Sequence, residues 1–517
     1  MKGSPASAPA GRGAPEAPGI PSPRRWDLLK VPVLGAFFRW RHARTALQAL
    51  LLGLSAIIIL DGLFGPQLAP KNMAGILPWV HWRGFVALAL LVMGNLFCMA
   101  CPFMLTRRLA KKILPGNGNW PRVFRSKWLA LFLLFLFLWA YEAFDLWATP
   151  WWTAWLALAY FAAAFVIDGF FTGAALCEYV WPVGRVPFVI ARASPVEVVL
   201  RDSQVCADCS TRECIVGVWE KPRALVDGAP PDAEPRRTRD RGKLLQNGCE
   251  LWLYQETKHG NMDCTFCMEC IHACPYDNIG ILARPPAQEL WEDPLRAGVG
   301  RFSQRPDLAA LALFLTFAAF MNAFGMVSPV YALEEWLGSV LGITSGPILI
   351  GTIFLTGMVL LPLVLVAVTA WISASWSGSG RTLVQEATRY GYSLVPVGFG
   401  MWVAHYLFHF LIGGLAIIPA TQEYMADLGI PILGSPAWAL GPMVPESWLL
   451  PIELLFLELG LLVSVAVAYR IAQRDLAPRG SPLKGALPWC GLALGLSAAG
   501  IWLLLQPMEM RGTLMAG

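Results

Sequence analysis

Four cysteines near the middle of the chain have a spacing that is typical of iron–sulfur ligation. The run C-x2-C-x2-C-x3-C-P contains Cys264, Cys267, Cys270 and Cys274, and Pro275 follows the last cysteine. With this spacing, three thiolates hold one [4Fe–4S] cube and the fourth reaches a second cube. A zinc knuckle is the alternative, but structural zinc sites lack the C-P ending. The run therefore predicts an iron–sulfur site.

A second group of cysteines precedes this run. Cys206, Cys209 and Cys214 form a looser triplet, and Cys249 stands between the triplet and the run. Eight thiolates match the needs of two cubes. By analogy with two-cluster ferredoxins, we expect Cys249 to share one cube with the first three cysteines of the run. The triplet would then share the other cube with Cys274. The long gap before Cys249 leaves one cube with spare thiols as the alternative.

The composition indicates that these cysteines belong to a membrane protein. Hydrophobic residues make up 56% of the 517 residues and charged residues 15%, and the mean hydropathy is +0.52. These values are typical of polytopic membrane proteins. The net charge of +5 is modest and does not predict a nucleic-acid partner. Clustered thiols of this spacing favour metal clusters in a reducing compartment over disulfides.

The sequence contains nine apolar stretches that are long enough to cross a bilayer as helices. Crossing takes roughly 20 helical residues. We expect spans near 44–63, 82–101, 127–147, 153–175, 307–327, 347–372, 393–418, 449–469 and 486–506. The fold class is thus predicted to be mainly α, a polytopic helical membrane protein with a ferredoxin-like α+β insert.

Basic residues orient these spans. They concentrate before the first span and after the second, sixth and eighth spans, which the positive-inside rule assigns to the cytoplasm. We therefore expect a cytoplasmic N-terminus, a cytoplasmic cluster domain and an outer C-terminus in the cell inner (cytoplasmic) membrane. The predicted organisation is a disordered tail (1–25), a four-helix core (26–190), a two-cluster domain (191–290) and a five-helix membrane domain (300–517).

The first four spans contain two similar hairpins, each ending in a Cys/Pro turn. The first turn contains Cys98, Cys101 and Pro102, and the second contains Cys177, Trp181 and Pro182. These cysteines are candidates for a redox dithiol, further cluster ligands or a metal site, with ordinary buried thiols as the alternative.

Two such turns followed by a two-cluster insert resemble the NosR/NapH/CcoG group of membrane polyferredoxins. The segment from Phe97 to Phe103 is similar to that group's first Cys-Pro turn, and Cys177-Glu178-Tyr179-Val180-Trp181-Pro182 is similar to the second. Trp181 departs from the pattern, because the group usually has a second cysteine there. The resemblance covers roughly residues 44–285 and implies membrane-bound iron–sulfur chemistry.

Two histidines within the seventh span are further candidates. His405 and His409 are four residues apart, so they share one face of a helix. Ionisable residues at this depth are functional candidates. They could contact a quinone head group or ligate b-type haem, but two histidines on one helix cannot ligate opposite faces of the same haem. A hydrogen-bonded pair between helices is the alternative.

Two functions follow from these features. The first is an electron conduit, in which two [4Fe–4S] clusters pass electrons between the quinone pool and a soluble ferredoxin-like carrier or a respiratory or photosynthetic complex. The chain would then be a component of a quinone-linked oxidoreductase. The second, which the resemblance suggests, is an assembly factor that uses the clusters to reduce metal or thiols for a respiratory metalloenzyme. We favour the conduit.

Overall fold

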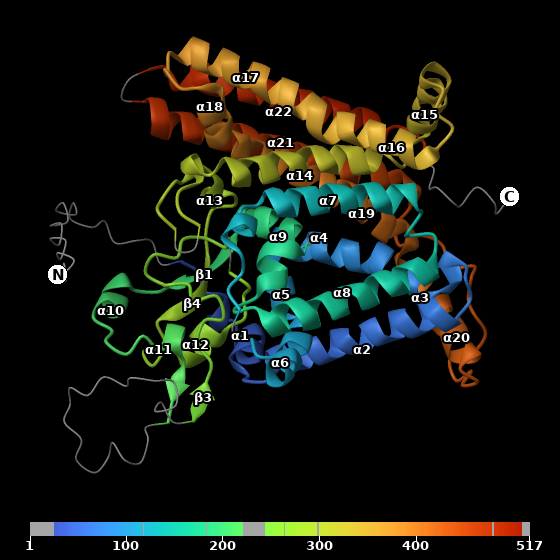
Figure 1. The fold of residues 1–517 in the computed structure, drawn as a ribbon, viewed down its shortest axis with the longest axis horizontal. Helices are drawn as coiled ribbons and strands as arrows, with labels where there is room; N and C mark the ends of the chain where they lie inside the picture. Colours follow the sequence, from blue (N-terminus) through green and yellow to red (C-terminus); the bar gives the residue numbers. More distant parts are fainter. Residues whose placement is uncertain are drawn as a thin grey trace, which may run out of the picture.

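The computed structural model describes residues 25–116, 118–181, 184–220, 243–262, 264–296, 299–477 and 480–508. The predicted tail, 1–25, lies almost wholly outside these ranges. The described chain is mainly helical, and its long helices run side by side in layers (Figure 1).

Eight of the described helices are long and apolar enough to cross a membrane. Several contain an internal turn of 3-10 or π-helix, so they carry more than one label. They are α2 (Ala43–Phe64), α3–η3–α4 (Met73–Ile76, Leu77–Trp82, Arg83–Met93), α8 (Pro150–Phe170), α14 (Pro306–Phe324), α16–η10–α17 (Gly346–Leu355, Thr356–Leu360, Leu361–Ser377), α18–η11–α19–η12–α20 (Leu383–Tyr390, Gly391–Leu394, Val395–Gly413, Gly414–Ala416, Ile417–Asp427), α21 (Glu446–Leu476) and α22 (Pro482–Leu504).

Two predicted spans differ from the structure. The span expected near 127–147 is α7 (Trp128–Ala143), an apolar helix of only 16 residues. The span expected near 82–101 begins earlier, at Met73, and its long helix ends at Met93. Asn72 explains the early start, because its side chain caps this helix by accepting the Ala74 N–H at 2.8 Å. The multi-pass character of the chain is confirmed.

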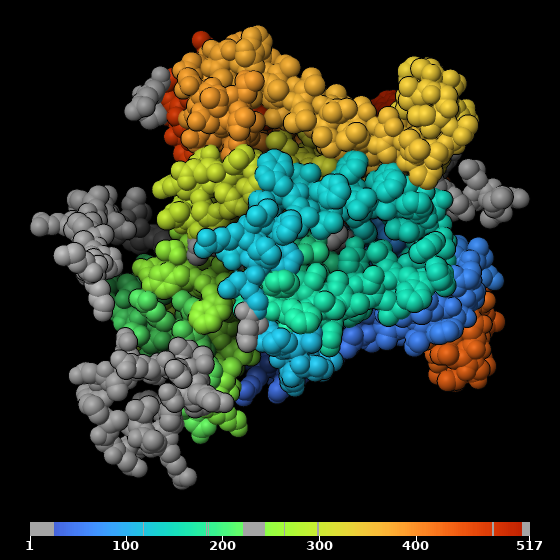
Figure 2. Space-filling model, viewed as in Figure 1, coloured from blue at the N-terminus to red at the C-terminus, as the bar shows by residue number. Residues whose placement is uncertain are grey.

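The helices form two groups that meet along a seam. In the first half of the chain, α8 packs against α2 and against α6 (Phe103–Ile113); in the second half, α19 packs against α14 and α21, and α22 against α17 and α21. The halves meet where α4 contacts α19 and where α7 contacts α14 and α16. Figure 2 shows the first-half helices, blue to teal, beside those of the second half, yellow to orange.

Glycines let the helices of the second half approach closely. A Cβ atom at Gly398 would lie 2.7 Å from the Thr316 Cα, and one at Gly460 would lie 2.6 Å from the Pro396 oxygen. Lipid is as apolar as a leucine side chain, so membrane helices depend on such close packing of small residues. The largest buried apolar cluster is accordingly centred on α14 and α19.

The cysteine-rich region lies at one end of the helices, which we call the inner end (Figure 1). Strand β1 (Val196–Leu200) pairs antiparallel with β4 (Ile279–Ala283), with Val198 opposite Ile281; β2 (Val218–Trp219) pairs with β3 (Leu244–Gln246). Four short helices complete the region: α10 (Ser203–Ala207), α11 (Glu213–Val216), α12 (Glu269–Ala273) and α13 (Gln288–Trp291). At the opposite, outer end lie α3, α15 (Ser328–Leu341) and α20.

Candidate functional site

The eight cysteines of the central insert lie on or beside its short elements. Cys206 is on α10, Cys214 on α11 and Cys270 on α12, while the others lie in the connecting segments. Cys267 and Cys270 are buried, and the other six are half-buried. Both predicted sets therefore belong to one small region at the inner end of the helices.

The first predicted set contains thiols that influence one another electrostatically. Burial is the largest cause that raises the pKa of Cys270 well above its ordinary value, and the charges of Cys267, Cys264 and Cys249 are the next causes. Burial likewise raises the pKa of Cys267 to about 12. Cys249, which is distant in sequence, is thus a neighbour of the first three cysteines of the run.

The second predicted set shows the same relation. Burial, followed by the charges of Cys274, Cys206 and Cys209, raises the pKa of Cys214 to about 12. Cys249 also contributes to this shift, and its N–H donates to the Cys214 oxygen at 2.9 Å. Cys274, Cys206, Cys209 and Cys249 therefore all lie close enough to Cys214 for their charges to act on it.

The backbone between the cysteines adopts an uncommon conformation. Phe266 and Met268, which alternate with the cysteines of the run, have φ of 50° and 62°, and Arg212, between Cys209 and Cys214, has φ of 50°. Left-handed backbone costs about 1–3 kcal/mol at a non-glycine residue and concentrates at functional sites. Both groups of cysteines thus contain residues in left-handed backbone conformation.

Backbone N–H groups also point at two of the thiols. The Leu253 N–H donates to Cys249 Sγ and the Asn278 N–H donates to Cys274 Sγ, each at 3.4 Å. Such bonds favour the thiolate form and tune the potential of a bound cluster. Cys249 and Cys274 are also the two cysteines expected to join their sets from a distance.

Among the described residues, no three or more His, Cys, Asp and Glu side chains are arranged to hold a single metal ion. Ligands of one zinc ion all stand about 2.0–2.3 Å from one centre. The ligands of a [4Fe–4S] cube do not share one centre, because each thiolate binds its own iron at a separate corner.

Buried ion pairs attach the cysteine-rich region to the membrane helices. The Arg44 guanidinium, at the start of α2, contacts Glu250 at 2.7 Å and Glu269 at 2.8 Å; Arg107 on α6 contacts Glu250 at 2.8 Å. Burial alone would raise the pKa of Glu250, but Arg107 and Arg44 hold it below its ordinary value. The two glutamates directly follow or precede Cys249 and Cys270, so the network fixes the cysteine segments.

A second attachment passes through Asn95. Its side-chain amide, just beyond α4, donates to the Asn261 oxygen at 3.1 Å and to the Cys264 oxygen at 2.8 Å. Gly94 makes this approach possible with φ of 60°, and a Cβ there would lie 3.0 Å from Asn261 Nδ2. The end of one membrane helix is thus hydrogen-bonded to the cysteine run.

The two Cys/Pro turns touch each other through aromatic rings. Phe103, after the first turn, lies edge-on to Trp181 of the second with ring centroids 4.8 Å apart, and Trp181 also contacts Tyr160 at 4.0 Å. Cys98 lies on α5 (Leu96–Met99) and Cys177 on the π-helix η5 (Leu176–Val180). Trp181 therefore fills a packing position between the turns.

The two intramembrane histidines lie apart from the cysteines. The rings of His405 and His409 on α19 are 4.8 Å apart and perpendicular, and His405 is buried. Both ring nitrogens of His405 and Nε2 of His409 have no hydrogen-bond partner among the described residues. Because both rings come from one helix, they do not fit as the two axial ligands of one haem.

Arg83 is a charged residue within the membrane helices that was not among the predicted site residues. With the helix starting at Met73, Arg83 lies inside a span, donates to the Tyr141 hydroxyl at 3.1 Å and stacks over Trp79, Tyr141 and Tyr406 at 4.4–5.2 Å. In the sequence, the helix-capping residue Asn72 was the feature that could have indicated the start at Met73.

No feature of the sequence could have indicated the ion pairs of Arg44 and Arg107. Their positive charge was already accounted for by the positive-inside rule.

Comparison with known proteins gives no relative for this chain. Searches of known protein-family models, of curated proteins and of solved structures each found no match.

Proposed function

We propose that this protein is a membrane-bound iron–sulfur electron-transfer protein. The observation that carries the proposal is that eight cysteines, whose spacing predicts the ligands of two [4Fe–4S] clusters, lie in one small region at the inner end of a multi-pass helical bundle. When bound, each cluster would supply a site that takes up and releases one electron. The proposed ligands are Cys249, Cys264, Cys267 and Cys270 for one cluster, and Cys206, Cys209, Cys214 and Cys274 for the other.

The surrounding residues fit this role. The backbone at Phe266 and Met268 has positive φ, as is common at functional sites, and the N–H donors to Cys249 and Cys274 stabilise negative sulfur. The ion pairs of Glu250 and Glu269, which adjoin Cys249 and Cys270, hold the first set against the membrane helices. These features support a rigid ligand shell next to the bilayer, which electron transfer between a lipid-soluble and a soluble partner requires.

The partners we propose are the quinone pool and a cytoplasmic ferredoxin-like carrier or a respiratory or photosynthetic complex. The resemblance to the NosR/NapH/CcoG group supports this role. The orientation that the basic loops predict would place both clusters on the cytoplasmic side of the inner membrane.

The assembly-factor alternative would use the clusters together with the thiols of the first Cys/Pro turn, Cys98 and Cys101. Burial raises the pKa of Cys101 to about 11, so this thiol stays neutral at pH 7 and is a weak nucleophile. Thiol or copper reduction at this turn therefore has less support than electron transfer through the cluster domain.

The test is reduction of the purified protein by a quinol. We expect anaerobically purified protein in lipid nanodiscs to lose visible absorbance and gain an EPR signal when a short-chain quinol is added. The variant Cys98→Ser/Cys101→Ser should respond in the same way. Absence of any response to quinols, to dithionite-reduced ferredoxin or to other low-potential carriers would contradict the proposal. Loss of an oxidase's metal in cells carrying the double variant, with normal quinol reduction, would favour the assembly role.

A further inference from the structure

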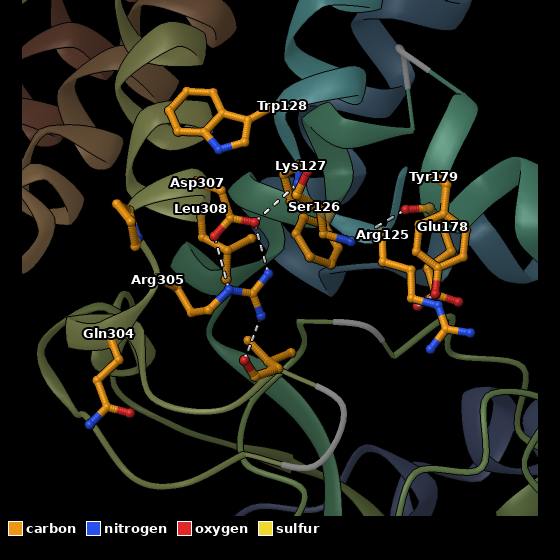
Figure 3. A pocket seen from close by; sticks show the side chains of 13 residues that line it. Arg125, Ser126, Lys127, Trp128, Glu178, Tyr179, Gln304, Arg305, Asp307 and Leu308 are labelled. Atoms are coloured by element: carbon orange, nitrogen blue, oxygen red, sulfur yellow. Dashed lines mark hydrogen bonds and ion pairs between the residues drawn. The ribbon is translucent and has the colours of Figure 1, made fainter. Parts of the chain in front are cut away.

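A pocket of about 580 Å³ lies at the inner end of the bundle, where four separate parts of the chain meet (Figure 3). One of these parts is α9 (Arg185–Ile190), which contributes Phe188. Residues 125–128 come from the end of η4 (Arg122–Arg125) and the start of α7; Glu178 and Tyr179 come from η5; residues 304–308 come from the start of α14 and the segment before it. This volume is within the usual range for small-molecule sites. None of the proposed cluster ligands lines it.

Charged groups hold one side of the pocket in place. The Lys127 backbone N–H donates to Asp307 Oδ2 at 3.0 Å. The Arg305 guanidinium donates two hydrogen bonds, each of 2.9 Å, to the same carboxylate. The Lys127 ammonium donates to the Glu178 backbone oxygen at 3.3 Å and lies 4.8 Å from the centre of the Phe188 ring. Asp307 therefore joins the start of α7 to the start of α14 and leaves the pocket with a defined polar wall.

Apolar and aromatic side chains form another part of the pocket lining. Trp128, Phe188 and Leu308 line the same pocket as Arg125, Lys127 and Glu178. Trp128 is 53% exposed on the surface of the helical bundle, where an apolar chain from the bilayer could reach it. A ligand must therefore combine a flat or apolar body with groups that bind both a cation and a carboxylate.

A quinone has this combination of properties. Its ring offers apolar faces, its two carbonyl oxygens accept hydrogen bonds from groups such as Lys127 and Arg125, and its quinol hydroxyls can donate to a carboxylate such as Glu178. Its isoprenoid tail belongs in the hydrocarbon layer beside Trp128. An anionic phospholipid head group fits less well, because Asp307 occupies Arg305 and Glu178 adds a second negative charge to the pocket.

The position of the pocket also favours a redox ligand. Glu178 directly follows Cys177 in the second Cys/Pro turn, and residues 299–304 connect the cysteine-rich region to α14. We propose that this pocket binds the head group of a membrane quinone. The inference deepens the proposed function and rests on it, since it names the site at which the quinone pool would meet the protein.

The test measures binding separately from electron transfer. The full-length protein in nanodiscs is titrated with a fluorescent alkyl-hydroxyquinoline N-oxide, a quinone analogue whose emission is quenched on binding, and then with decylubiquinone as competitor. We expect saturable quenching that the competitor reverses. Glu178→Gln, which is nearly isosteric, and Lys127→Gln should each weaken the affinity about tenfold, the loss of one charge-assisted hydrogen bond.

Arg122→Gln is the matched control, because Arg122 lies on the same short helix as Arg125 but does not line the pocket. It should bind as the wild type does, and thermal unfolding should show that all three variants are folded. Wild-type protein without saturable quenching would overturn the inference. So would pocket variants that keep wild-type affinity, or that instead lose a co-purified anionic phospholipid detected by native mass spectrometry.

The two proposals fail in different ways. If quinol reduces the protein normally in both pocket variants, a different quinone site exists and only the pocket is wrong. If the analogue binds as expected but wild-type protein contains no reducible iron, the pocket stands and the proposed function falls.

Discussion

At the scale of single residues, the structure links each cysteine group to charged and polar partners that its spacing does not reveal. The spacing of the run predicts which thiols would share a cube by analogy with two-cluster ferredoxins, and this grouping stays a prediction. It could not predict that Arg44 and Arg107 would turn toward Glu250. A basic residue before a span satisfies the topology rule whether or not it has a buried partner.

Glu250→Ala tests this attachment. The change leaves two largely buried guanidinium groups without their shared carboxylate, and removing one partner of a buried pair costs about 3 kcal/mol. We expect that loss in the free energy of unfolding in detergent, together with faster proteolysis of the cysteine-rich region. Arg39→Gln is the control: its side chain is 44% exposed against Asp277, and such pairs contribute less than about 1 kcal/mol. Equal losses in both variants would contradict the attachment.

The buried carboxyl of Glu289 is expected to make the free energy of unfolding depend on pH. Burial would raise its pKa, but Arg284, Arg296 and the Asn261 N–H hold the pKa of this buried carboxyl below its ordinary value. A carboxyl with a lowered folded-state pKa stabilises the fold above its unfolded-state pKa, about 4.3. That stabilisation is lost as the pH falls through the folded-state pKa.

We therefore expect the free energy of unfolding to decrease below about pH 4.3. In the variant Glu289→Gln, the free energy of unfolding should be lower at neutral pH. Its decrease toward acid pH should be smaller than in the wild type. Chemical denaturation from pH 6 down to pH 3.5 measures both. An identical acid slope in the two proteins would show that Glu289 does not contribute.

At the scale of elements, the apolar pattern predicted the existence of the membrane helices better than their ends. Eight of nine expected spans are long helices, because an apolar stretch of that length has few alternatives in a membrane protein. The start of the second span was wrong by nine residues. Residues 73–81 include Pro78, Trp79 and His81, so hydropathy alone did not separate this first part of the helix from a loop.

The two Cys/Pro turns make an element-scale prediction. Trp181 contacts both Phe103 and Tyr160, so Trp181→Ala should remove packing between the turns and cost about 3 kcal/mol. Trp152→Ala serves as control, because Trp152 is 49% exposed on the bundle surface. Thermal unfolding in detergent compares the two. A loss at Trp181 no larger than at Trp152 would mean that the aromatic contact does not hold the turns together.

At the scale of the whole molecule, the cysteine-rich region and α20 lie at opposite ends of the bundle (Figure 1). The direction across the membrane is predicted from the basic loops. In the described part of the chain, Met508 bridges to Val327 near the end that carries α15, which is the end opposite the cysteine-rich region. Sequence could not predict how the two halves join, because the contacts of α4 with α19 and of α7 with α14 are long-range and depend on shape.

Reporter fusions test this direction. Alkaline phosphatase joined after residue 508 should be active, and green fluorescent protein joined after Leu476, at the inner end of α21, should fluoresce. Exchanging the two reporters should silence both. Active phosphatase after Leu476 would place the cysteine-rich region on the outer side and contradict the proposed cytoplasmic partner.

The most direct test of the central claim is the iron and acid-labile sulfide content of protein purified without oxygen. Two cubes predict about eight iron and eight sulfide atoms per chain. Cys274→Ser should lower this content by about half, because it removes one ligand of the second set, whereas Cys490→Ser, in α22 and away from the insert, should leave it unchanged. Protein that contains no iron or sulfide, or zinc in their place, would contradict the account.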